Sequence, residues 1–160
     1  MKPVLQALVL AERIYSDAQT NKKVICGTFN QLVVGMVQLV AQKPDGSIVN
    51  LIPGGTDMGS PSVFISLTDV VDGTEIALQF VNQTKNIVLL QTGFKLQVKD
   101  RLQTIEIVAP LPSMSQIVKE TGIYSLDILC EGEILGSHRL VVRNLNEPPT
   151  PPAPLPTPPQ

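Results

Sequence analysis

The stretch from Glu120 to Arg143 constrains the fold of this chain more than any other. It holds two apolar segments that are separated by Glu131-Gly132. Two such segments on either side of a short turn that contains glycine are typical of an antiparallel hairpin. We therefore expect this stretch to form the last two strands of a β-sandwich, with Glu131 and Gly132 at the turn.

Strands are also expected through the remainder of the main body. Hydrophobic residues make up 43% of the chain and charged residues only 16%, and the abundance of Val, Ile, Leu and Thr favours strands over exposed helices. An extra hairpin is predicted over 36–52, and one short helical turn, with Ser115 as its cap, is predicted within 113–120. The further core strands are expected at residues 4–15, 23–34, 62–68, 74–82, 87–98 and 102–109.

Together these elements predict an all-β fold with about eight core strands plus the extra hairpin. Because sheet edges must be paired or covered, two packed sheets are the natural solution, and we expect an antiparallel, immunoglobulin-like two-sheet β-sandwich. Residues 62–68 show the clearest alternation, which predicts a half-buried strand with Val63, Ile65 and Leu67 inward. Gly27 lies inside the strand expected at 23–34 and indicates a bulge or a close backbone approach.

The chain divides into a main body and a tail of different composition. We expect a β-sandwich domain over residues 1–145 and a disordered tail over 146–160, where eight of the thirteen residues from Pro148 to Gln160 are proline. Proline fixes φ and lacks an amide donor, so this tail is predicted to be an extended polyproline II segment. It is either a solvated spacer or, through its two PxxP spacings, a ligand for an aromatic-grooved module.

Charge and hydropathy exclude two classes of partner. The net charge is −2 and no basic stripe is present, so nucleic-acid binding is not expected. No segment has the length of a transmembrane helix. The apolar run Val4–Ala11 weakly resembles a signal peptide, but Gln6 interrupts it and no small-residue cleavage site follows, so a strand in a cytoplasmic protein is the better interpretation.

Candidate chemistry is limited to two cysteines and a single histidine. Cys26 and Cys130 are expected to be buried thiols, with one disulfide between neighbouring strands as the alternative. A two-residue turn would place Cys130 opposite Glu133 and His138 opposite Ser125, which argues against a Cys130–His138 pair. His138 has the parity of Leu140 and Val142, so it is expected to point inward unless a bulge at Gly136 shifts its phase. We expect it to be a structural histidine.

The sequence contains only a weak signal for a metal site. Asp57, Asp69, Asp72 and Glu75 lie in or near expected loops, as in calcium-binding sandwiches, but Asp is also an ordinary turn residue. The sequence has no Cys/His cluster of the kind that binds zinc. We expect no catalytic, cofactor-binding or metal-ligating residue, and no cofactor.

Several segments in order resemble an uncharacterised bacterial family that is known only as a domain of unknown function. The matching segments are ALVLAERIY at 7–15, GTFN at 27–30, PSVFISLTD at 61–69, GIY at 122–124 and CEGEILG at 130–136. The resemblance covers most of residues 4–143 and implies a small β-sandwich with no known activity. Residues 35–59 are longer than the usual connection of that family, and the proline-rich tail lies outside its pattern.

Glu120-Thr121-Gly122-Ile123-Tyr124 is also similar to the Asp-x-Gly-x-Tyr corner of immunoglobulin-like domains, where the tyrosine hydroxyl bonds to the backbone a few residues upstream. Cys130 follows Tyr124 by six residues rather than two, so the similarity implies a similar corner and not immunoglobulin membership. Tyr124 is the residue on which this corner would depend.

Two functional hypotheses follow from these observations. The first is a non-enzymatic binding or scaffold domain that meets a protein partner through loops 53–61 and 69–73, through an exposed sheet edge or through the tail. The second is a calcium-dependent binding module or an unrecognised enzyme that uses Cys26, Cys130 or His138. The sequence does not specify the oligomeric state or the partner.

Overall fold

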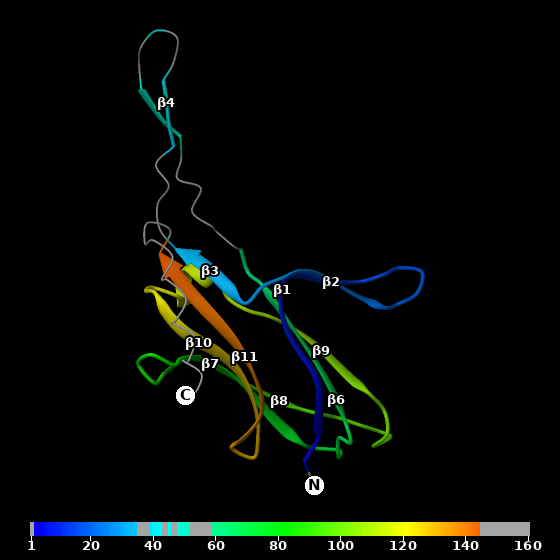
Figure 1. Cartoon of the computed structure of the whole chain (residues 1–160). Coiled ribbons are helices and arrows are strands. Elements are labelled where there is room, and N and C mark those ends of the chain that lie inside the picture. The colour runs from blue at the N-terminus through cyan, green and yellow to red at the C-terminus, as the bar shows by residue number, and fades with distance from the viewer. Residues whose placement is uncertain (1, 35–38, 43–44, 46–47, 52–58, 145–160) are drawn as a thin grey trace, which may run out of the picture.

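The computed structural model describes residues 2–34, 39–42, 45, 48–51 and 59–144, and these are almost entirely strand. Figure 1 shows the elements along the chain. The strands are β1 (Val4–Ser16), β2 (Lys23–Thr28), β3 (Gln31–Val34), β4 (Leu39–Gln42), β5 (Ile48–Leu51), β6 (Ser62–Thr68), β7 (Glu75–Asn82), β8 (Ile87–Lys95), β9 (Ile105–Pro110), β10 (Gly122–Cys130) and β11 (Glu133–Asn144). One four-residue helix, α1 (Met114–Ile117), precedes β10.

Two main sheets form a β-sandwich, as the sequence predicted. The first has the order β2-β1-β6-β9 and the second the order β3-β11-β10-β7-β8. All neighbours are antiparallel except β3 and β11, which run parallel. The orders β1-β6-β9 and β8-β7-β10-β11 correspond to strands A-B-E and C′-C-F-G of the immunoglobulin fold. The two main sheets together contain nine of the described strands, one more than expected.

The core lies between the inner faces of these sheets. Every second residue of β6, β7 and β10 points inward, because strand side chains alternate between the two faces. The fully buried side chains include Leu10, Val63, Ile65, Leu67, Val70, Ile76, Leu78, Phe80, Tyr124, Leu126, Ile128 and Leu140. Met114 of α1 closes one margin of the same core.

The single strand expected over 23–34 is wrong, because the chain changes sheets in the middle of it. β2 ends at Thr28, one residue after Gly27, whose φ is +66°, and β3 then joins the second sheet beside β11. Both sheets hold the crossing residues. The Phe29 amide donates to the Leu10 carbonyl of β1 at 3.3 Å, and the Val141 amide of β11 donates to the Asn30 carbonyl at 2.9 Å.

Strand β6 is more deeply buried than the half-buried strand that its alternation predicted. Val63, Ile65 and Leu67 point inward as expected, but Phe64 and Ser66 on the opposite face are also buried. Because β6 lies between β1 and β9, side chains of both neighbours flank its outer face.

Three predicted boundaries are also corrected. Strand β8 ends at Lys95 rather than at residue 98. The amide of Val98 instead donates a hydrogen bond to the Asp72 carboxylate at 2.9 Å. Strand β9 begins at Ile105 rather than at residue 102, because residues 100–103 form a turn. Leu102 lies in this turn and is 80% exposed. Helix α1 begins one residue before Ser115, so the predicted cap at Ser115 is wrong.

Both predicted hairpins are present. β10 and β11 turn through Glu131 and Gly132, whose φ values of +51° and +81° suit a type I′ turn. β4 and β5 pair with each other in a separate two-stranded sheet. The last described strand ends at Asn144, and the predicted tail over 146–160 lies outside the described residues. No helix in the described part of the chain has the length and hydrophobicity to cross a membrane.

We predict that Gly27→Ala destabilises the fold because it forces an alanine into the left-handed region. The strain is expected to lower the free energy of unfolding by about 1–2 kcal/mol. An added Cβ would also lie 2.7 Å from Oε2 of Glu12. Urea unfolding followed by circular dichroism measures the change. Gly59→Ala is the matched control, because no atom lies within 4 Å of its added Cβ, and equal stability of all three proteins would contradict the role assigned to Gly27.

Candidate functional site

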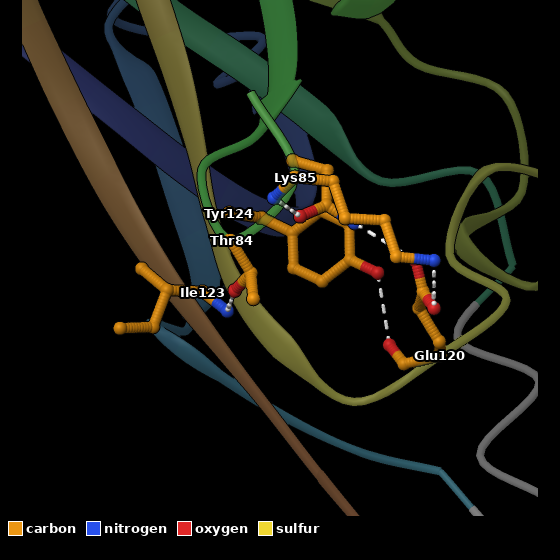
Figure 2. Close-up of polar contacts among 6 residues, drawn as sticks. Thr84, Lys85, Glu120, Ile123 and Tyr124 are labelled. Atoms are coloured by element: carbon orange, nitrogen blue, oxygen red, sulfur yellow. Dashed lines mark hydrogen bonds and ion pairs between the residues drawn. The ribbon is translucent and has the colours of Figure 1, made fainter. Parts of the chain in front are cut away.

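A tyrosine corner with several polar contacts lies at the start of β10 (Figure 2). The Tyr124 hydroxyl donates to the Glu120 carbonyl oxygen at 2.9 Å. The tyrosine is only 1% exposed, and its ring stacks on Phe80 with centroids 5.6 Å apart. Burial, followed by the nearby Glu120 charge, raises the pKa of Tyr124. The hydrogen bond expected from the sequence is therefore present.

The turn between β7 and β8 completes this corner. The Glu120 carboxylate accepts from Asn82 Nδ2 at 3.1 Å and from Lys85 Nζ at 2.6 Å. The Thr84 hydroxyl accepts the Ile123 amide at 3.0 Å. These contacts join two turns that lie far apart in the sequence, and they satisfy the polar groups that they involve. The corner organises the fold and leaves no reactive group free.

His138 lies four positions along the ladder from Cys130. A register shift between Ile128 and Leu129 places His138 opposite Leu126, so the predicted pairing with Ser125 is wrong. The extra residue is Leu135, next to the Gly136 at which the sequence allowed for a bulge. His138 Nε2 lies 3.0 Å from the Phe29 carbonyl oxygen. Because a carbonyl only accepts, Nε2 donates, and His138 binds the segment that crosses between the sheets.

The two cysteines lie in different sheets, and both are free thiols, so the alternative of a disulfide is wrong. Cys130 is buried as predicted and pairs with Glu133. Burial, and then the negative charge of Glu131, raises the pKa of the Cys130 thiol. Cys26 is exposed, contrary to the prediction, because among the described strands β2 pairs only with β1, and the two strands extend beyond the sandwich (Figure 1).

Two of the four candidate metal ligands are engaged with other groups. Asp69 pairs with Arg101 at 3.3 Å, and Asp72 accepts the Val98 amide. Glu75 lies opposite Lys95 on the neighbouring strand. Asp57 falls outside the described residues. In the part of the chain that the structure describes, no three His, Cys, Asp or Glu residues are placed to hold a metal ion.

The described surface contains a groove on the outer face of the second sheet that sequence reasoning missed. Its volume is about 530 Å³, within the range of ligand pockets. Ala77 of β7 and Gly93 of β8 are paired and form its small-residue floor. The other lining residues are Glu75, Ile76, Gln79, Gln91, Phe94, Lys95, Leu129, Glu131 and Gly132. The groove depends on the pairing of Ala77 with Gly93 across two strands. The residue pattern of either strand alone does not show it.

The edge of the sheet beside this groove is apolar. Among the described strands, β8 pairs only with β7. Ile87, Val88 and Leu89 are between 40% and 50% exposed. The groove and the exposed apolar residues lie toward opposite ends of the same strand, and we call them together the β8 surface, defined as the groove-lining residues together with 87–95.

A second polar cluster lies elsewhere on the outer face of the same sheet. The Asp127 carboxylate, only 4% exposed, accepts hydrogen bonds from the Ser125 and Ser137 hydroxyls. Gln83 in turn donates to the Ser125 hydroxyl at 2.6 Å. These donors satisfy the buried carboxylate, so the cluster stabilises the outer face.

No protein-family model matches this chain, and no curated protein sequence is significantly similar to it.

We predict that Tyr124→Phe lowers the free energy of unfolding by about 1 kcal/mol, the usual net contribution of one intramolecular hydrogen bond. The phenylalanine ring retains the stack on Phe80, so only the bond to Glu120 is lost. Chemical unfolding of the purified protein measures the change. Tyr15→Phe is the matched control, because Tyr15 is 54% exposed. If both variants are as stable as the wild type, the corner bond does not stabilise the fold.

We predict that the native protein has one reactive thiol. Cys26 is exposed and should react rapidly with an aromatic disulfide reagent, whereas Cys130 is buried with a raised pKa and should react only on unfolding. Titration should count one thiol in buffer and two thiols in denaturant. Cys26→Ser should leave none in buffer, and fast reaction of Cys130 in that variant would show that its site is open.

Proposed function

We propose that the protein is a non-enzymatic binding domain that contacts a protein partner through the β8 surface. The observation that supports this proposal is the groove of about 530 Å³ on β8, a strand that has no second partner among the described strands and is apolar and exposed at Ile87, Val88 and Leu89. An extended peptide that adds to a sheet edge gains affinity from backbone hydrogen bonds and specificity from pockets beside the edge. The β8 surface offers both features to an extended segment of a partner.

The chemistry of the groove also suits a protein segment. Its floor at Ala77 and Gly93 is small and apolar, and Glu75 and Lys95 lie at one end with opposite charges. A groove of this kind accepts an apolar side chain on its floor and polar groups at its rim.

The loop over 69–73, which the sequence analysis selected as a contact loop, lies at the same end. Its backbone is fixed, because the Gly73 amide donates to the Leu96 carbonyl at 2.9 Å and Asp72 binds the Val98 amide. Val71 remains 45% exposed on this fixed loop. Only residues 59–61 of the loop expected over 53–61 are described, and the tail lies outside the described residues, so the proposal does not depend on either of them.

Two of the three residues of the enzymatic hypothesis, His138 and Cys130, have structural contacts that support the non-enzymatic proposal. His138 binds Phe29, and Cys130 is buried in the core opposite Glu133. Each is therefore explained by what it contributes to the sandwich.

We predict that Gly93→Val abolishes partner capture while the domain stays folded. A Cβ at Gly93 would meet only the Ile76 carbonyl oxygen, at an ordinary contact distance of 3.8 Å, and its side chain would fill the groove. Affinity capture from a lysate with quantitative mass spectrometry should identify a protein that the wild type retains and Gly93→Val loses. Thermal unfolding confirms that the variant is folded.

Gly59→Val is the matched control for that experiment. Its added Cβ meets no atom within 4 Å, and it lies in the other candidate contact loop, outside the groove. Loss of the partner from Gly59→Val but not from Gly93→Val would move the contact surface to that loop and overturn the proposal.

A further inference from the structure

Among the four outer strands of the two main sheets, β8 is the least protected against pairing with another chain. Natural sheets protect their edges with charges, prolines or very short strands. Strand β3 has four residues, β2 begins with Lys23, and β9 contains Glu106 and Pro110. Strand β8 has nine residues, contains no proline, and carries no charge before its last residue, Lys95.

The bulge in β8 determines which part of this edge can pair regularly. The register with β7 shifts between Phe80 and Val81, which leaves Leu89 as the extra residue. The regular segment therefore runs from Leu90 to Lys95. Within it, Leu90, Thr92 and Phe94 share the inner face, since they lie opposite Phe80, Leu78 and Ile76 of β7.

From this pattern we infer that β8 pairs antiparallel with β8 of a second copy of the chain, about a two-fold axis at Thr92. This inference rests on the proposed function, because it names the partner of the same strand edge. Residues directly opposite each other in an antiparallel pair point to the same face. An axis at Thr92 places Leu90 of each copy opposite Phe94 of the other and keeps both residues on the inner face.

Packing and charge favour this register. Leu90 and Phe94 are only partly buried, and both pack against the edge of the core. Aromatic and aliphatic side chains directly across a strand pair stabilise it, and each Leu90–Phe94 pair would extend the core from one copy into the other. Lys95 would lie opposite Leu89 of the second copy, so no like charges are opposed.

A second copy fits this edge better than an unrelated strand, because the regular segment is complementary to itself. Two-fold dimers with self-complementary interfaces are the commonest soluble oligomers. The joined sheet would contain the five strands of each copy. One strand pair buries a small area for an interface, so the dimer should be weak and concentration-dependent.

Disulfide cross-linking tests the register. Thr92 is exposed, and in a Cys26→Ser background Thr92→Cys would place two thiols opposite each other on the axis. Mild oxidation should convert this variant into a covalent dimer. Val88→Cys is the matched control, because Val88 is also exposed on β8 but would lie far from its equivalent in the second copy. Equal rates of cross-linking for the two variants would overturn the proposed register.

Sedimentation velocity of the full chain tests the dimer itself. The wild type should shift from monomer to dimer as its concentration rises. Thr92→Lys, which places an inward-pointing charge on the edge, should remain a monomer with unchanged circular dichroism. A wild type that is monomeric at every concentration would overturn the inference. The proposed function would still hold if Gly93→Val lost a different protein partner, so the two failures are distinguishable.

Discussion

The hydrogen bond from Tyr124 to the Glu120 carbonyl fixes the beginning of β10, the strand on which the larger sheet depends. β10 is the third of five strands and pairs with both β7 and β11. Because the tyrosine ring stacks on Phe80 of β7, the same side chain ties the start of β10 to its neighbour. Bonds from Asn82 and Lys85 to Glu120 then attach the β7–β8 turn, so one corner positions three consecutive strands of the sheet.

A second constraint joins the two sheets. The chain crosses between them at Phe29 and Asn30, and a crossing backbone must find partners for its polar groups. Leu10 of β1 accepts the Phe29 amide, while Val141 and His138 of β11 donate to the carbonyls of Asn30 and Phe29. In a sequence, a single histidine suggests a catalytic role. Here its ring nitrogen binds the segment at Phe29 and Asn30, which is hydrogen-bonded to both sheets.

The sequence was informative wherever structure depends on local pattern. Alternation identified the inner residues of β7, and the Glu131-Gly132 turn fixed the closing hairpin. It failed where a tertiary contact decided the outcome. The single extra residue in β11 moved His138 from Ser125 to Leu126, and the crossing between sheets at Phe29 and Asn30 divided the strand expected at 23–34. The groove was missed because its floor joins Ala77 and Gly93, whose pairing depends on the register of two strands.

The dependence on tertiary contacts also explains why the sequence predicted an exposed sheet edge without identifying β8 as that edge. Its sequence has the composition of a buried strand, with Ile87, Val88, Leu89 and Leu90 in one run. Only the strand order places this run at an edge, where exposed apolar residues and unpaired backbone groups normally favour aggregation. The other outer strands are four or six residues long, whereas β8 has nine residues and its one charge, Lys95, lies at its end. A fold that protects three edges and leaves the fourth apolar, beside a groove, has the features expected of a contact surface.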